Sequence, residues 1–196
     1  MKKLNSNSSR RTFLKKSVAA SSFFIVPRFV LGGNGYTAPS DKLSIASIGC
    51  GGKGSSDIAH ASVNGRENVI ALCDIHPSGG HGVVDSRKRF PKARFYTDFR
   101  ELLSEEKDLD AVTISTPDHT HGIIAKTAME NNIHVYVQKP LTHNIKEARL
   151  LTELARNKKI VTQMGNQGAS HPGQKYVQQW IREKRIGNVS EVKVWT

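Results

Sequence analysis

The sequence predicts an α/β fold, with a parallel, doubly wound sheet that carries helices on both faces. Three observations lead to this prediction. Short apolar runs alternate with helix-compatible stretches six times between residues 43 and 164, which is typical of parallel sheets with helical crossovers. A loop of the form G-x-G-x-x-G follows the first apolar run, and an aspartate follows the second. In such a sheet both positions lie at one edge, at the carboxyl ends of neighbouring strands.

The loop reads G-C-G-G-K-G over residues 49–54, between a predicted strand (43–48) and a predicted helix (55–63). Its first glycine lets the chain leave the strand in a tight turn, and its last lets the helix pack close to the strand. The glycine between them leaves room for a pyrophosphate, which would meet free N–H groups at the positive end of the helix dipole. We therefore expect the glycines of this loop to bind a nucleotide: Gly49, Gly51, Gly52 and Gly54.

The second strand, residues 68–73, leads into Asp74, which lies 20 residues after Gly54. A carboxylate at this position accepts hydrogen bonds from the ribose hydroxyls of an adenosine nucleotide. Ile75 and His76 follow, so no arginine stands beside Asp74 to bind a 2′-phosphate, and the sequence favours NAD over NADP. A glycine-rich turn without a ligand is the alternative, but the strands, loop, helix and acid all have the spacing of the motif.

The remaining elements follow from apolar spacing and helix caps. We expect helices over residues 83–90, 99–106, 120–131, 144–159 and 172–185, and strands over residues 94–96, 111–115, 134–137, 160–164 and 191–195. Asn144 and Glu147 have the spacing of a capping box at a helix start. The residues expected to face inward are Ile123, Ile124, Thr127 and Ala128, then Ile145, Ala148, Leu151, Leu154 and Ala155, and then Tyr176, Val177, Trp180 and Ile181.

Polar residues gather at the carboxyl ends of the fourth and fifth strands, as T-P-D-H-T-H (residues 116–121) and Q-K-P (residues 138–140). Because ligands of a doubly wound sheet lie beyond the carboxyl ends of its strands, both stretches should line the same cleft as the glycine loop. Asp118, His119 and His121 raise the question of a metal site. No further ligand spacing supports one, so we expect these residues to contact a cofactor or substrate, and no metal to be bound.

The net charge of +12 at first suggests a nucleic-acid-binding protein, but its distribution argues against one. Residues 1–30 carry seven basic residues and no acid, whereas the rest of the charge is spread among many acids. The basic tail holds S-R-R-T-F-L-K at residues 9–15, and an apolar stretch over residues 18–26 that is too short to cross a bilayer. This pattern is typical of a twin-arginine export signal. We therefore expect the twin-arginine export machinery as a partner, a periplasmic location, and no nucleic acid.

Two cysteines do not make a disulfide framework. Cys50 lies in the glycine loop and Cys73 ends the second strand, so neighbouring strand ends could join them in a disulfide. Our default expectation is that both are small buried residues.

With these residues in place, the chain resembles the Gfo/Idh/MocA oxidoreductases, in particular exported members with a twin-arginine leader. The resemblance rests on the glycine loop, on T-P-D-H-T-H at residues 116–121 and on Q-K-P-L at residues 138–141, and it covers residues 42–196. It implies a Rossmann domain that binds NAD(P), and then an α/β domain that covers the substrate and often builds oligomers. Typical substrates of the family are sugars, inositols and related polyols.

By this resemblance, four residues take positions on the cofactor side of the cleft: Thr116, Pro117, Asp118 and His121. Lys139 matches the family's lysine at the reacting centre, where its ammonium would hydrogen-bond the substrate hydroxyl and assist proton movement. Two positions depart from the family's usual pattern, which has glutamate in place of Gln138 and commonly asparagine in place of Asp118. A neutral amide can still hydrogen-bond a cofactor ribose, but it cannot share charge with the lysine.

The resemblance also predicts the domain organisation. We expect the export signal and a linker over residues 1–40, the NAD(P)-binding Rossmann domain over residues 41–187, and only the first strand of a second α/β domain over residues 188–196. In the family, the general base and most of the substrate pocket come from that second domain. The chain would then carry the cofactor half of an active site, and the resemblance allows a homo-oligomer of the full-length form.

Three functions remain open on these grounds. The first is NAD(P)-dependent hydride transfer to or from a sugar or polyol. The second is cleavage of a glycoside in which NAD acts transiently, so that product forms without net NADH. The third is a truncated chain that binds a nucleotide without turnover.

Overall fold

The computed structural model describes residues 37–63, 65–78, 80 and 82–195, so most of the predicted export leader lies outside the described residues. Contacts within the chain divide it after Asp41, and the whole sheet belongs to the second unit, Lys42–Thr196. The described part of the first unit contains one short 3-10 helix, η1 (Pro39–Asp41).

In the described residues, six parallel strands form one sheet in the order β3-β2-β1-β4-β5-β6. They are β1 (Ser44–Ile48), β2 (Asn68–Cys73), β3 (Arg94–Tyr96), β4 (Ala111–Ile114), β5 (His134–Gln138) and β6 (Thr162–Gly165). Ile48 at the end of β1 lies opposite Cys73 on one side and Ile114 on the other. The direction in which strands are added reverses between β1 and β4, which confirms the predicted doubly wound Rossmann sheet and puts its switch point at the glycine loop.

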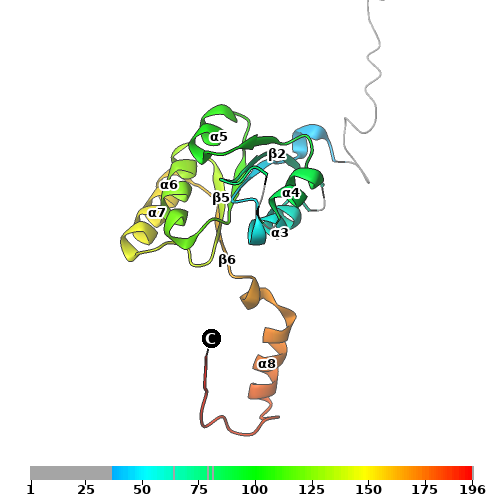
Figure 1. Cartoon of the computed structure of the whole chain (residues 1–196). Coiled ribbons are helices and arrows are strands. Elements are labelled where there is room, and N and C mark those ends of the chain that lie inside the picture. Colours follow the sequence, from blue (N-terminus) through cyan, green and yellow to red (C-terminus); the bar gives the residue numbers. More distant parts are fainter. Residues whose placement is uncertain (1–36, 64, 79, 81, 196) are drawn as a thin grey trace, which may run out of the picture. The chain divides into compact units, whose positions relative to one another are not determined.

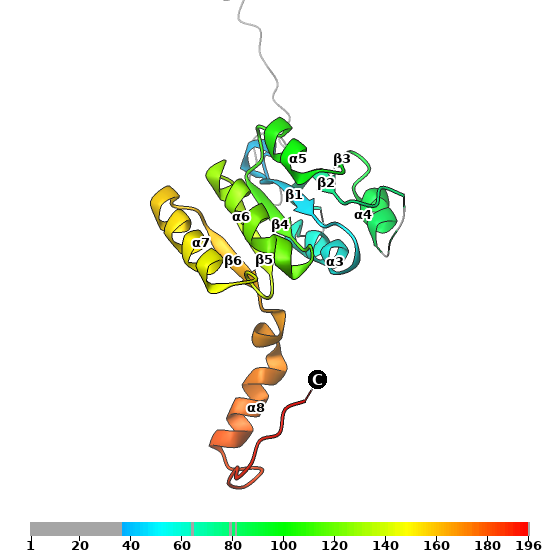
Figure 2. The same cartoon turned by 60° about the vertical axis from the view of Figure 1, so that its left-hand side comes forward.

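Helices cover both faces of this sheet (Figure 1). On one face lie α3 (Gly52–Ala61) and α4 (Val83–Arg89), and on the other lie α5 (Phe99–Glu105), α6 (His121–Glu130) and α7 (Ile145–Lys158). A short 3-10 helix, η2 (Asp118–Thr120), precedes α6, and a second, η3 (Gln167–Ser170), precedes α8 (Pro172–Arg182). Figure 2 shows that α8 begins where the chain has left the sheet after β6.

Each face of the sheet buries its own apolar cluster. The larger cluster joins the sheet to α5, α6 and α7, and includes Ile48, Val112, Met129 and Leu151. The smaller one joins the sheet to α3 and α4, and includes Ile58 and Val83 among others. Burial on both faces explains why the central strands read as continuous apolar runs without alternation.

Several sequence predictions about apolar residues are wrong. Ile123 is 52% exposed and Ile145 is 73% exposed, although both have the spacing of an inward face. In α6, Ile124 and Ala128 are buried as predicted, but Gly122 and Ala125 are buried as well, so the buried face is rotated away from Ile123. Ile145 is the first residue of α7, and there the helix has not yet reached its packing partners.

The apolar face of α8 is also not part of the core. Tyr176, Val177, Trp180 and Ile181 are between 45% and 57% exposed, and no residue of this helix is buried by the described chain. The final predicted strand, residues 191–195, is not formed in the described structure. A strand exists only where a neighbouring strand accepts and donates its backbone hydrogen bonds, and no described segment pairs with this one. No helix in the described part of the chain has both the length and the apolar character that a membrane crossing requires.

Candidate functional site

At two positions of the glycine loop, neighbouring backbone atoms lie too close to leave room for a side chain. Gly49 has a φ of +80°, and a Cβ there would lie 2.8 Å from the backbone carbonyl of Ser115. A Cβ on Gly54 would lie 1.7 Å from the carbonyl oxygen of Gly49. Only glycine allows α3 to approach the end of β1 this closely, which agrees with the roles predicted for the first and last glycines of the loop.

The first turn of α3 is less crowded than Gly49 and Gly54. The helix begins at Gly52, three residues earlier than predicted, and no described side chain caps its first turn. Gly52 has a φ of +46°, and no described atom lies within 4 Å of a Cβ built on it. The first N–H groups of a helix have no partner within the helix, so this end of α3 offers donors and the positive end of a dipole to an anion.

Asp74 lies at the end of β2, beside the loop. One oxygen of its carboxylate, Oδ2, accepts from the backbone N–H of Gly51 at 3.1 Å, and the other accepts from His76 N–H at 3.2 Å. These two bonds fix the direction of the carboxylate, and each oxygen keeps a further lone pair for an outside donor. The backbone is fixed beside it, because the N–H groups of Gly49 and Cys50 both donate to the carbonyl of Cys73.

Asp74 and the loop line one cleft of about 740 Å³ at the carboxyl ends of β1, β2 and β4. This volume is in the range of cofactor sites. Five of the predicted site residues line the cleft, namely Gly49, Gly51, Asp74, Thr116 and Pro117. The other predicted site residues lie outside its lining, namely Gly52, Gly54, Asp118, His121, Gln138 and Lys139.

Arg100 also lines the cleft, although sequence reasoning did not select it. Its guanidinium donates to both carboxylate oxygens of Asp98, at distances from 2.6 to 3.1 Å. The hydrogen bonds from Arg100 hold the pKa of the Asp98 carboxyl below its ordinary value. The arginine in the lining of this cleft is therefore already paired with an acid.

His121, the first residue of α6, is fully buried. Its Nδ1 lies 2.7 Å from the carbonyl oxygen of Pro140, and its Nε2 lies 2.8 Å from that of Thr116. A ring nitrogen that carries a proton donates to the carbonyl it faces, so the ring joins the loop after β4 to the turn after β5. Any effect of His121 on a ligand would pass through these two loops.

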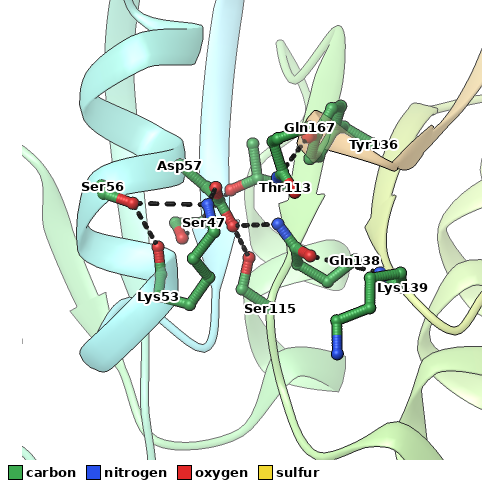
Figure 3. A network of polar contacts seen from close by, with 10 residues as sticks. All are labelled: Ser47, Lys53, Ser56, Asp57, Thr113, Ser115, Tyr136, Gln138, Lys139 and Gln167. Atoms are coloured by element: carbon green, nitrogen blue, oxygen red, sulfur yellow. Dashed lines mark hydrogen bonds and ion pairs between the residues drawn. The ribbon is translucent and has the colours of Figure 1, made fainter. Parts of the chain in front are cut away.

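The turn after β5 holds Lys139, whose side chain is exposed and points away from a polar network formed by the residues around it (Figure 3). At the centre of this network is Asp57 on α3, which is 6% exposed. Its Oδ2 accepts from the Ser115 hydroxyl and from the Gln138 amide, each at 2.8 Å. Its Oδ1 accepts from the ammonium of Lys53. Nearby, the Tyr136 hydroxyl donates to the side-chain oxygen of Gln167 at 2.9 Å, in the amide orientation that satisfies the groups around it.

Sequence reasoning missed Asp57, although one signal was available. Asp57 lies three residues after Gly54 and one before Ile58, and all three are the buried residues of α3. A charged residue at an inward-facing helical position is unusual, since carboxylates are rarely buried without a partner. Its partner Ser115 directly follows β4 and its partner Gln138 ends β5, and nothing in the local sequence pairs them with α3.

The two cysteines singled out from sequence, and a histidine after β6, take structural positions. Cys50 and Cys73 are buried and free of any disulfide within the described chain. Burial is the main cause that raises the pKa of each thiol to about 12. His171 caps α8, because its Nδ1 accepts from Gly173 N–H at 3.1 Å. In the described residues, no group of three His, Cys, Asp or Glu side chains is arranged to hold a metal.

A family model described as an oxidoreductase family with an NAD-binding Rossmann fold matches residues 43–166, the span that builds the sheet and the cleft. The chain belongs to the Gfo/Idh/MocA oxidoreductase family. The sequence resemblance to this family is therefore confirmed, whereas the export leader stays a prediction.

The chain is also similar to individual named proteins. It is 29% identical over 183 residues to the glycosyl hydrolase family 109 protein 1 of Shewanella sp. strain ANA-3, covering 82% of this chain and 40% of that protein. It is 33% identical over 88 residues to the UDP-N-acetylglucosamine 3-dehydrogenase of Acidithiobacillus ferrooxidans, covering 45% of this chain and 27% of that one.

Among solved structures, the scyllo-inositol dehydrogenase of Lactobacillus casei, with bound NAD(H) and scyllo-inositol, superposes with a TM-score of 0.63. The sequence identity is 18%, and the match covers 76% of this chain and 43% of that one, so this likeness supports the fold alone. The chain thus spans about two fifths of the length of the first relatives and structures that it matches.

Proposed function

We propose that this chain is the nucleotide-binding part of an NAD-dependent oxidoreductase that acts on a sugar or polyol by hydride transfer. The observation that carries the proposal is the cleft at the switch point of the sheet. There, Gly51, the N-cap residue of α3, and the fixed carboxylate of Asp74 border one volume of about 740 Å³. The family's description as NAD-binding oxidoreductases supports the same reading.

The residues of the cleft fit a dinucleotide. The first N–H groups of α3, which follow the cleft residue Gly51, would hold the pyrophosphate, and the remaining lone pairs of Asp74 would accept from the adenosine ribose hydroxyls. Thr116 and Pro117 would border the cofactor from the end of β4. When bound, NAD supplies a nicotinamide carbon that accepts or donates a hydride.

Lys139 is the residue of this chain that we assign to the reacting centre. It follows Gln138 at the carboxyl end of β5, the strand next to β4, whose end lines the cleft. Its ammonium Nζ would donate a hydrogen bond to the substrate oxygen on the carbon that exchanges the hydride. A positive charge there stabilises the oxygen as its proton leaves, which lowers the pKa of that hydroxyl.

The cleft favours NAD over NADP. A 2′-phosphate would approach the carboxylate of Asp74, and the repulsion between two anions disfavours it. Arg100, the arginine that lines this cleft, is already paired with Asp98, which compensates its positive charge. NAD presents two ribose hydroxyls at this point, which Asp74 can accept.

Calorimetric titration of the chain with NAD and with NADP tests this proposal. We expect one NAD per chain, weaker binding of NADP, and a loss of NAD affinity of about 10-fold or more in Asp74→Ala, since a hydrogen bond to a charged group contributes about 1.5–3 kcal/mol. Asp108→Ala is the matched control, because Asp108 is an exposed acid outside the cleft. The proposal fails if the folded chain binds neither nucleotide, or if the two variants behave alike.

A second candidate function is glycoside cleavage in which NAD is reduced and reoxidised within one turnover. The likeness to glycosyl hydrolase family 109 proteins favours it, at 29% identity over 183 residues. The two functions differ in one readout, because hydride transfer as the net reaction accumulates NADH, whereas glycoside cleavage releases a sugar without it. Absorbance at the NADH band during turnover of a glycoside by the full-length protein distinguishes them.

We further propose that the protein is exported through the twin-arginine machinery to the periplasm. The support is the sequence S-R-R-T-F-L-K at residues 9–15. Fusion of residues 1–40 to a periplasmic reporter tests the proposal, and we expect Arg10→Lys with Arg11→Lys to abolish export. Equal export with both substitutions would contradict a twin-arginine signal.

A further inference from the structure

Asp57 is a buried carboxylate that the proposed function does not use. It lies on α3, and its side chain is 4% exposed. An ionised carboxylate at such a position is stable only when other groups compensate its charge and satisfy its lone pairs. Three side chains do so, from three different elements: Lys53 from the start of α3, Ser115 from the end of β4 and Gln138 from the end of β5.

The side-chain amide of Gln138 connects Asp57 to the turn that holds Lys139 through two hydrogen bonds. Its Nε2 donates to Asp57 at 2.8 Å, and its Oε1 accepts from the backbone N–H of Lys139 at 3.2 Å. The side chain packs closely over Gly165 of β6, since a Cβ built on that glycine would lie 2.9 Å from the Gln138 amide. The direction of the Gln138 amide, and with it the backbone of Lys139, is therefore set by the carboxylate on α3.

The other oxygen of Asp57 is bound to the glycine loop. The ammonium of Lys53, a residue of that loop, turns back onto Asp57 and does not point out over the start of the helix (Figure 3). Lys53 is half-exposed, whereas Asp57 is buried, so the ion pair lets the carboxylate keep its charge below the surface. One carboxylate thus contacts both the predicted phosphate loop and the residue that precedes the predicted reacting lysine.

We propose that Asp57 is a positioning residue that fixes the Lys139 turn through Gln138 and couples it to the glycine loop through Lys53. This inference rests on the proposed function for the role of Lys139, but the network itself exists without a cofactor. It also gives a physical reason for an amide at position 138. A glutamate there would put a second carboxylate at hydrogen-bond distance from Asp57, with no proton to share at neutral pH.

The test uses the whole chain without nucleotide. In Asp57→Ala, the Gln138 amide loses its acceptor, and we expect hydrogen exchange of the Lys139 backbone amide to become about tenfold faster, as for the loss of one charge-assisted hydrogen bond. Glu106→Ala is the matched control, because Glu106 is also a buried carboxylate, paired with Arg94 at the opposite edge of the sheet. It should destabilise the fold without a selective change at Lys139.

A charge exchange keeps the inference testable if Asp57→Ala does not fold. In Gln138→Glu the two neighbouring carboxylates raise each other's pKa in the folded state, so stability is kept at low pH and lost as the pH rises. The charged groups that face this pair are Lys53 and the two carboxylates themselves. We expect the melting temperature to fall by roughly 5 °C at pH 8, and by less at pH 5. Asp57→Asn combined with Gln138→Glu should recover at least half of the loss at pH 8.

Two results would overturn the inference. One is Lys139 amide exchange that changes equally in Asp57→Ala and Glu106→Ala. The other is a double variant whose loss equals the sum of the two single losses, since residues that do not interact have additive effects. NAD titration of the unsubstituted chain is run beside these measurements. Its failure would reject the proposed function alone, because every readout above is made without nucleotide.

Discussion

The carboxyl edge of the sheet has two sides that are built differently. The glycine side, residues 49–54 with Asp74, is held mainly by backbone groups, and its closest approach is between Gly54 and the carbonyl of Gly49. The lysine side, residues 115–121 with 138–141, is held by side chains that reach it from other elements, chiefly Asp57 and His121. The first side depends on the absence of side chains at a few positions, and the second depends on the presence of particular ones.

The largest expected effect comes from a substitution that disrupts the packing of the glycine side. In Gly54→Ala the new Cβ would lie 1.7 Å from a backbone oxygen, so α3 must move away from β1. Overpacking usually costs about 1–3 kcal/mol and occasionally more, and a backbone clash belongs at the upper end, so we expect a loss of about 3 kcal/mol in the free energy of unfolding. Urea denaturation measures it. Gly168→Ala is the control, because no described atom lies within 4 Å of its Cβ, and a similar loss there would contradict the steric argument.

The second largest effect is expected from a substitution that removes a contact of the lysine side. In His121→Ala the carbonyls of Thr116 and Pro140 lose the ring that lies against both of them. A buried group left without its partner costs about 1–3 kcal/mol, and we expect a loss of stability in that range together with weaker NAD binding. His119→Ala removes an exposed histidine two residues away, and should change stability by less than about 0.5 kcal/mol. Equal losses in thermal unfolding would show that the buried ring does not join the two loops.

A smaller effect concerns the helix that follows the lysine turn. Asn144 Oδ1 accepts from Glu147 N–H at 3.0 Å, which confirms the N-cap half of the predicted capping box. The reciprocal bond is displaced by one residue, because Glu147 Oε2 accepts from His143 N–H at 3.1 Å and not from the N–H of Asn144. We expect Asn144→Ala to lower the free energy of unfolding by about 1 kcal/mol. Asn157→Ala, at an exposed position in the last turn of α7, is the matched substitution and should not destabilise the chain.

The smallest expected effect concerns the two buried cysteines beside the glycine loop, Cys50 and Cys73. Because burial raises the pKa of both Cys50 and Cys73 from 9.0 to about 12, the folded chain keeps both thiols protonated at neutral pH. We expect little alkylation by iodoacetamide at pH 7.5 without denaturant, and two modified cysteines in urea. The raised values also mean that their contribution to stability is complete below pH 9 and declines as the pH rises toward 12. Rapid labelling of the native chain would contradict their burial.

Much of the fold could be predicted from local sequence. The bounds of β2 and β3 are the predicted ones, and the other strands lie within two residues of their predicted positions. The glycine loop and Asp74 were found because a turn, a helix start and an acid at a strand end each have a local signature. The N-cap of Asn144 belongs to the same class, because it and its partner Glu147 lie three residues apart.

The errors share one cause. The spacing that selected Ile123 and Trp180 reports that a helix has an apolar face, but not whether another element covers that face. Ile123 lines the cleft, and Trp180 is 45% exposed on a helix that packs against no strand of the described sheet. The network around Asp57 was missed for the same reason. Its partner Gln138 lies 81 residues away in the sequence, so no local pattern connects the two.

The sequence alone therefore determined the order of the strands and helices, the glycine loop and the acid after β2, because each depends on residues a few positions apart. Only the tertiary structure decided that β5 lies beside β4, which brings Gln138 under α3 and His121 against Pro140. The physical reason is that propensities and caps act within one turn or one strand. The pairing of buried polar groups instead depends on which strands become neighbours, and that is fixed only when the whole sheet packs.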